Sequence, residues 1–203
     1  MLAEDVVYRL RSIYPEGYFH INKDPFYLLI STVLSQRTRD DVTIPTTQKL
    51  FNVFGTAQEM AAAGTDEIEG LIKNVGFYRV KARRIIDISN IILNDHGGVV
   101  PDSIEELVKL PGVGRKTANC VLGYGFEKDV IAVDTHVHRI SNRMGLVNTS
   151  EPDETEKALE KVILKKDWKD INGLMVLFGQ NICRPVGPRC EECIMDDICA
   201  KIL

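Results

Sequence analysis

The chain has 203 residues, of which 44% are apolar and 27% charged, an ordinary composition for a globular protein with a hydrophobic core. No run of about 18 apolar residues occurs, and the charged amino terminus lacks the apolar segment of a secretory signal, so we expect a cytoplasmic protein without a membrane span. The net charge of −4 excludes a uniformly basic surface. The bases nevertheless gather in segments, at Arg37 and Arg39, at Lys73, Arg79, Lys81, Arg83 and Arg84, at Arg115 and Lys116, and at Arg184 and Arg189.

Apolar residues recur at helical spacing along most of the chain, so the sequence predicts an all-α fold of about ten short helices. Residues 1–17 have the pattern of an amphipathic helix. Another helix is expected after Asp24-Pro25, because aspartate is a good N-cap and proline suits the first helical position. The apolar stripes that follow are Phe26, Leu29, Ile30, Val33 and Leu34; Ile68, Leu71, Ile72 and Val75, ended by Gly76; Val80, Ile85, Ile88 and Ile92, ended near Gly97-Gly98; Leu159, Val162 and Ile163; and Ile171, Leu174, Met175 and Phe178.

A helical hairpin is predicted around residues 110–118, LPGVGRKTA. Ser103 and Glu106 have capping-box spacing and open its first helix. Glycine permits a left-handed backbone, so N–H groups of the turn and of the next helix can point toward one phosphate oxygen. The glycines alone would also suit a plain turn between helices. The first helix carries Ile104, Leu107 and Leu110, and the second carries Ala118, Val121 and Leu122.

Asp134 stands between a short apolar run and a helical pattern, in residues 131–139, IAVDTHVHR. Its plainest role is to cap the helix that follows. A catalytic role would require Lys116 nearby in space, and a capping carboxylate is compatible with such a role. His136 and His138 are two residues apart, so they diverge on a helix and do not form a metal-binding pair.

Four cysteines near the carboxyl end follow the pattern C-x6-C-x2-C-x5-C, at Cys183, Cys190, Cys193 and Cys199, and Cys120 is left over. Without a secretory signal, the cysteines indicate a thiolate chelate rather than disulfides. Zinc sites made of four cysteines usually pair two short CxxC loops, whereas only one CxxC is present here. The spacing therefore leaves zinc and an iron–sulfur cubane equally open. Cys120 is expected to be a small packed residue.

Together the hairpin with its lysine, the Val-Asp-Thr-His segment and the four-cysteine tail resemble the endonuclease III branch of the helix–hairpin–helix DNA glycosylases. Residues 33–36, VLSQ, and residues 75–82, with the pattern VGFYxxKA, add to the resemblance, which covers about residues 20–200. It implies an all-α fold with a six-helix barrel domain at 22–127. It further implies an iron–sulfur cluster domain made of residues 1–21 and 128–203, with a cleft between the two domains.

The resemblance also implies a base excision repair glycosylase with abasic-site (AP) lyase activity that removes oxidised or saturated pyrimidines such as thymine glycol. The partner would be double-stranded DNA with a damaged base or abasic site, bound by a monomer in the cytoplasm on the nucleoid. Lys116 would be the nucleophile that forms a Schiff base, and Asp134 its catalytic partner. One 4Fe–4S cluster would be bound by Cys183, Cys190, Cys193 and Cys199. The implied DNA contacts are Gln36, Phe77, Lys81, Gly112, Val113, Gly114, Arg115, Arg184 and Arg189.

Other interpretations compete with this one. A mismatch thymine or uracil glycosylase of the same fold usually carries tyrosine or serine at the position of Lys116, and adenine glycosylases have an added carboxyl-terminal domain. A DNA-binding module without activity would not need both Lys116 and Asp134, and a zinc-stabilised helical protein is the weakest alternative. Phe77 alone would equally suit core packing. Residues 36–40, QRTRD, depart from the family's commoner small residues after the glutamine.

Overall fold

The structure, a computed structural model, describes residues 2–15 and 22–202. Every regular element in these ranges is a helix and none is a strand, which confirms the predicted all-α class. The chain divides into two compact units, one of residues 22–126 and one of residues 1–21 with 127–203. The observed boundary follows Phe126, one residue before the predicted one. Within the described part, no helix is long and apolar enough to cross a membrane.

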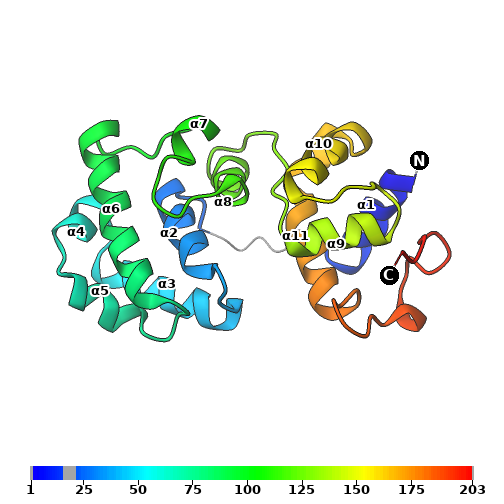
Figure 1. Ribbon diagram of the computed structural model, residues 1–203, viewed down its shortest axis with the longest axis horizontal. Coiled ribbons are helices and arrows are strands. Elements are labelled where there is room, and N and C mark those ends of the chain that lie inside the picture. Colours follow the sequence, from blue (N-terminus) through cyan, green and yellow to red (C-terminus); the bar gives the residue numbers. More distant parts are fainter. Residues whose placement is uncertain (1, 16–21, 203) are drawn as a thin grey trace. The chain divides into compact units, whose positions relative to one another are not determined.

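The unit of residues 22–126 is built around two central helices (Figure 1). Helix α2 packs against α3, α6 and α8, and the long helix α6 packs against α4 and α5. The helices are α2 (Pro25–Ser35), α3 (Asp40–Val53), α4 (Ala57–Ala62), α5 (Thr65–Ile72), α6 (Tyr78–His96), α7 (Ile104–Leu107) and α8 (Arg115–Cys120), which continues as a π-helix, η1 (Val121–Gly125).

Helix α2 begins as the sequence predicts. The Asp24 side chain accepts a hydrogen bond from the Tyr27 N–H at 2.7 Å, and Pro25 occupies the first turn. The predicted apolar residues are buried, with Leu29, Ile30, Val33 and Leu34 completely inaccessible, and α2 thus forms the centre of this unit's core. Because α2 ends at Ser35, the chain turns there and brings Gln36 to the surface loop.

Helix α6 begins and ends at residues with a left-handed backbone. Phe77, its N-cap, has φ 59°, and Gly97, its C-cap, has φ 60° at the predicted end. Ile85, Ile88 and Ile92 are buried as predicted. The prediction that Val80 continues this stripe is wrong, because Val80 is 47% exposed and Lys81 with Ala82 fills the inner face at that turn.

Two predicted helices are shorter in the structure than the apolar pattern indicates. Helix α5 ends at Ile72, four residues before Gly76. Val75 is buried in the turn that follows, and its N–H donates to the Ile72 carbonyl oxygen at 2.9 Å. Helix α7 ends at Leu107, so Leu110 is buried beyond it. Apolar residues in a tight turn can reach the same core as those of a helix, and periodicity does not distinguish the two.

The second unit gathers both ends of the chain around one core. Apolar residues of α1 (Leu2–Ile13), α9 (Thr135–Arg143) and α11 (Trp168–Asn181) share it, and α1 packs beside α11 although they are far apart in the sequence (Figure 1). The predicted stripe of α11 is buried, including Phe178. The remaining elements are α10 (Pro152–Val162) and two short 3-10 helices, η2 (Lys165–Asp167) and η3 (Cys190–Glu192).

Candidate functional site

The hairpin turn places Lys116 at the beginning of a helix. Gly112 has φ 76°, a left-handed backbone, and the next N–H, of Val113, donates to the Leu110 carbonyl at 3.0 Å. Gly114 is the N-cap of α8, so Lys116 is the second residue of that helix and is half-buried. The predicted order of turn, glycine cap and lysine is therefore present in the structure.

A side chain at Gly112 would displace the side chain of Arg84. A Cβ atom at this position would lie 2.8 Å from Cδ and from Nη1 of Arg84. The left-handed backbone already favours glycine at this residue. The hairpin turn is thus in direct contact with α6, the helix that carries Arg84.

Asp134 caps α9, as predicted. Its Oδ1 atom accepts hydrogen bonds from the N–H groups of His136 at 2.8 Å and Val137 at 2.9 Å. Both bonds use the same oxygen, so the cap leaves the second carboxylate oxygen for a different partner. Asp134 belongs to the second unit and Lys116 to the first.

Two arginines of α9 hold the loop that begins at the first cysteine of the cluster motif. Arg139 donates to the carbonyl oxygen of Cys183 at 2.9 Å, and burial lowers the pKa of its guanidinium. Arg143 donates to the carbonyl oxygens of Arg184 at 2.6 Å and Pro185 at 2.9 Å. Neither arginine is predicted from the sequence. Arg139 and Arg143 are four residues apart in the helix that follows Asp134, so they lie on one helix face, and this spacing could have indicated a shared role.

The two histidines of α9 have separate partners. His136 Nδ1 lies 3.2 Å from Nη2 of Arg139, whereas His138 Nδ1 lies 2.6 Å from Oγ1 of Thr155. The rings are therefore engaged with different neighbours, consistent with their divergence on the helix.

The four cysteines of the motif form no disulfide and are all partly exposed, and Cys183, Cys193 and Cys199 pack against the core of their unit. Burial raises the pKa of the Cys193 thiol, and the nearby charges of the other three cysteines raise it further. The four sulfur atoms thus lie near enough to interact electrostatically. In the described residues, no group of three or more His, Cys, Asp or Glu side chains is arranged to hold a single metal ion.

Two backbone N–H groups point at sulfur atoms of this motif. The backbone N–H of Met195 lies 3.4 Å from Cys193 Sγ, and that of Lys201 lies 3.4 Å from Cys199 Sγ. Donors of this kind stabilise thiolate charge, which a metal-binding cysteine requires. The remaining cysteine, Cys120, is buried as a small packed residue, as predicted.

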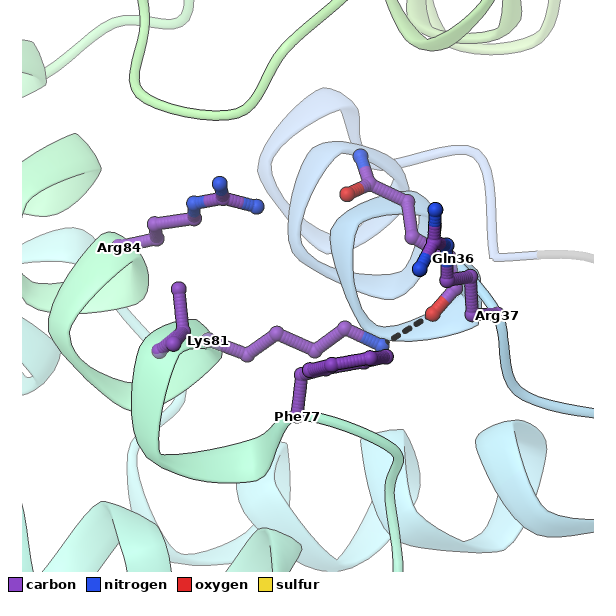
Figure 2. Close-up of a pocket in the computed structure, with 6 residues that line it drawn as sticks. Gln36, Arg37, Phe77, Lys81 and Arg84 are labelled. Atoms are coloured by element: carbon purple, nitrogen blue, oxygen red, sulfur yellow. Dashed lines mark hydrogen bonds between the residues drawn. The ribbon is translucent and has the colours of Figure 1, made fainter.

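A pocket of about 300 Å³ lies where two basic segments of the sequence meet (Figure 2). Phe77 stands at its edge and is 61% exposed, so the core-packing alternative for this residue is wrong. The Arg37 guanidinium lies 5.6 Å from the centre of the Phe77 ring. Lys116 is not among its lining residues, which are Gln36, Arg37, Phe77, Val80, Lys81 and Arg84.

Lys81 lies on the inner side of this pocket. Its ammonium donates to the backbone carbonyls of Leu34 and Gln36 and to the Thr38 hydroxyl. Burial, and to a smaller extent repulsion from the Arg84 charge, lowers the pKa of Lys81 to about 8. It would reach a DNA phosphate only if these bonds opened. The bases of the second unit differ, since Arg189 is exposed, 3.7 Å from a Glu192 carboxylate oxygen, and Arg184 is half-buried.

Comparison with known proteins gives the chain a family. Residues 30–165 match the HhH-GPD superfamily of base excision DNA repair proteins. The chain is 54% identical to endonuclease III of Thermotoga maritima over 198 residues, which cover 98% of this chain and 90% of that protein. The chain belongs to the endonuclease III family. It is accordingly a base excision repair enzyme with DNA glycosylase and AP lyase activity.

Further relatives agree with this assignment. Endonuclease III of Bacillus subtilis is 38% identical over 182 residues, covering 89% of this chain and 83% of that protein. A trapped covalent endonuclease III–DNA intermediate is similar with a TM-score of 0.89 and 36% identity, covering 96% of this chain and 92% of that chain. A thermostable thymine-DNA glycosylase has a TM-score of 0.87 but only 25% identity, covering 98% and 96%. The endonuclease III branch is therefore favoured over the mismatch glycosylases.

Proposed function

We propose that this protein removes oxidised or saturated pyrimidines such as thymine glycol from double-stranded DNA, acting as a monomer, and then cuts the strand at the abasic site. The observation that carries the proposal is the position of Lys116, half-buried in the first turn of the helix that follows the glycine hairpin. A mismatch thymine glycosylase would not need an amine there.

Lys116 is the nucleophile in this proposal. Its amine attacks C1′ of the deoxyribose, the C1′–N bond to the base breaks, and a Schiff base forms after the sugar ring opens. β-Elimination then breaks the bond between C3′ and its oxygen, which cuts the strand on the 3′ side. The positive end of the α8 dipole opposes an ammonium charge in the first turn, and so favours the neutral amine that attacks.

Asp134 assists the same sugar. Its second carboxylate oxygen, which the helix cap does not use, would stabilise the positive charge that develops as the base leaves and would assist proton transfers. The two cap bonds fix the conformation of the Asp134 side chain.

DNA recognition is assigned to three loops and the hairpin. Gln36 and Phe77 would fill the space left when the damaged base is flipped out of the stack, an event that costs a few kcal/mol. The exposed position of Phe77 supports this assignment. Phosphates would be bound by the hairpin, through Gly112, Val113, Gly114 and Arg115, and by the cysteine loop, through Arg184 and Arg189.

Cys183, Cys190, Cys193 and Cys199 are proposed to hold one 4Fe–4S cluster. The interaction of the Cys193 thiol with the other three cysteines and the N–H groups aimed at two of the sulfur atoms support this assignment. Four cysteine thiolates are the usual ligands of such a cluster. Base release and elimination need no electron transfer, so the proposed role of the cluster is structural. When bound, the cluster would stiffen the loop from Cys183 to Cys190 and fix its arginines for phosphate binding.

Base release from three duplexes tests the substrate class. Duplexes with thymine glycol, with a G·T mismatch and with a preformed abasic site would be incubated with the protein, and free base and cut strand would be measured separately. We expect base release and cutting with thymine glycol and cutting alone at the abasic site. Base release from the G·T duplex without strand cutting would instead establish the mismatch glycosylase.

A further inference from the structure

The ammonium group of Lys81 lies inside the protein rather than in solvent. The residue is 2% exposed, and its Nζ donates to the carbonyl oxygen of Leu34 at 2.8 Å, to that of Gln36, and to Oγ1 of Thr38 at 3.2 Å. An ammonium has three N–H donors, so all are used. Figure 2 shows the side chain extended from α6 toward the Gln36 carbonyl. Lys81 therefore ties the first turn of α6 to the end of α2 and the loop after it.

The two loops that meet at Lys81 each contain a non-glycine residue with a left-handed backbone. Arg37 has φ 54° and Phe77 has φ 59°. Side chains disfavour this conformation, so it persists only where neighbouring contacts determine it. The Lys81 bonds to Gln36 and Thr38 bracket Arg37 and fix that turn.

The loops also touch each other directly. The N–H of Gly76 donates to Thr38 Oγ1 at 3.2 Å, so this hydroxyl links Gly76 to the Lys81 amine. A Cβ atom at Gly76 would lie 3.0 Å from the carbonyl oxygen of Arg37. The backbone just before Phe77 is therefore packed against the backbone just after Gln36.

We propose that Lys81 is a positioning residue for base flipping, whose buried ammonium holds Gln36 and Phe77 in place before DNA binds. This role rests on the proposed function, because it assumes that these two side chains fill the space left by the flipped base. Loops that are fixed in advance lose little further conformational entropy on binding, and misplaced ones weaken the productive complex. Lys81 itself touches no reacting atom.

Lys81→Met tests the role, because methionine has a comparable length and no donor. Two single-turnover rates would be compared: excision from a thymine glycol duplex, and strand cutting of a single-stranded oligonucleotide with an abasic site, in which no base is flipped. We expect excision to fall about 10- to 100-fold and single-strand cutting to fall less than about threefold. The fluorescence of 2-aminopurine beside the lesion increases when its base unstacks, and this increase should be smaller in Lys81→Met than in the wild type.

Lys49→Met, at an exposed lysine of α3, makes the same charge change and should leave both rates unaltered.

Thr38→Val provides a second, milder variant in case Lys81→Met fails to fold. It removes the hydroxyl between Lys81 and Gly76 while the carbonyl bonds remain, and we expect a loss of about threefold in duplex excision only. Equal losses on both DNAs would show general destabilisation and overturn the role. So would excision at the wild-type rate in the folded variants. If the wild-type protein acts on neither DNA, the proposed function is wrong and the role falls with it.

Discussion

The side-chain amide of Gln36 donates a hydrogen bond of 2.8 Å to the carbonyl oxygen of Gly112. This bond joins the loop that follows α2 to the turn of the helical hairpin, 76 residues later in the chain. A residue assigned to the flipped-base gap and a turn assigned to a phosphate are thus parts of one connected surface within the same unit.

Gly112→Ala should weaken both the fold and DNA binding. The left-handed backbone disfavours alanine by about 1–2 kcal/mol, and the new methyl group would also displace Arg84. Urea unfolding measures the stability, and fluorescence anisotropy with an abasic-analogue duplex measures the affinity. The matched control is Gly70→Ala, in the last turn of α5 with no atom within 4 Å of an added Cβ, which should stabilise the protein by about 0.5 kcal/mol. Equal effects of the two changes would contradict the strain at Gly112.

Asp134→Asn separates the cap from the chemistry. Asparagine caps helices as well as aspartate does, so the melting temperature should stay close to that of the wild type. The lost negative charge should slow excision by about 100-fold or more, measured in single turnovers. Asp134→Ala should in addition lower the free energy of unfolding by about 1 kcal/mol. Full excision activity in Asp134→Asn would leave the residue with the capping role alone.

The pKa of Lys81 makes stability depend on pH in a defined direction. The folded protein releases this proton near pH 8, whereas the unfolded chain holds it up to about 10.5. Between these values the unfolded state binds more protons, so the free energy of unfolding rises with pH, by at most about 3 kcal/mol. Lys81→Met lacks this contribution. Urea unfolding of both proteins between pH 8 and 10.5 should therefore show that the free energy of unfolding of the wild type rises relative to that of the variant. A difference between the two free energies that does not change with pH would contradict the lowered pKa.

Arg189→Gln should remove one phosphate contact. The slope of log affinity against log salt should fall by about one, with little change in lesion preference. Lys169→Gln, at an exposed lysine of the same unit, is the control and should leave the slope unchanged. An unchanged slope in Arg189→Gln would take this residue out of the interface.

The elements that were predictable from the sequence are those set by local chemistry. Asp24-Pro25 and Asp134 begin helices because a carboxylate and a fixed φ act within a few residues. Gly97 ends α6 for the same kind of reason. The sequence pattern also predicted the glycine turn that places Lys116 at the start of a helix, because its spacing is read along the chain.

What could not be predicted depends on tertiary contacts. Lys81 looks like one of several surface bases in the sequence, and only the fold shows that carbonyls of α2 and its loop surround its amine. The same contact explains why Val80 is exposed, since the lysine side chain and Ala82 occupy the inner face of α6 at that turn. The bonds of Arg139 and Arg143 to the cysteine loop join residues more than 40 positions apart in the sequence. The only sign of these bonds in the sequence is the helical spacing of the two arginines.

The most direct test of the account is borohydride trapping on a thymine glycol duplex, followed by mass mapping of the modified peptide. A Schiff base between Lys116 and the sugar would be reduced to a stable amine, so the adduct should map to Lys116. Lys116→Gln should bind the duplex and give no adduct. An adduct on another residue, or undiminished trapping by Lys116→Gln, would contradict the assignment of Lys116 as the nucleophile.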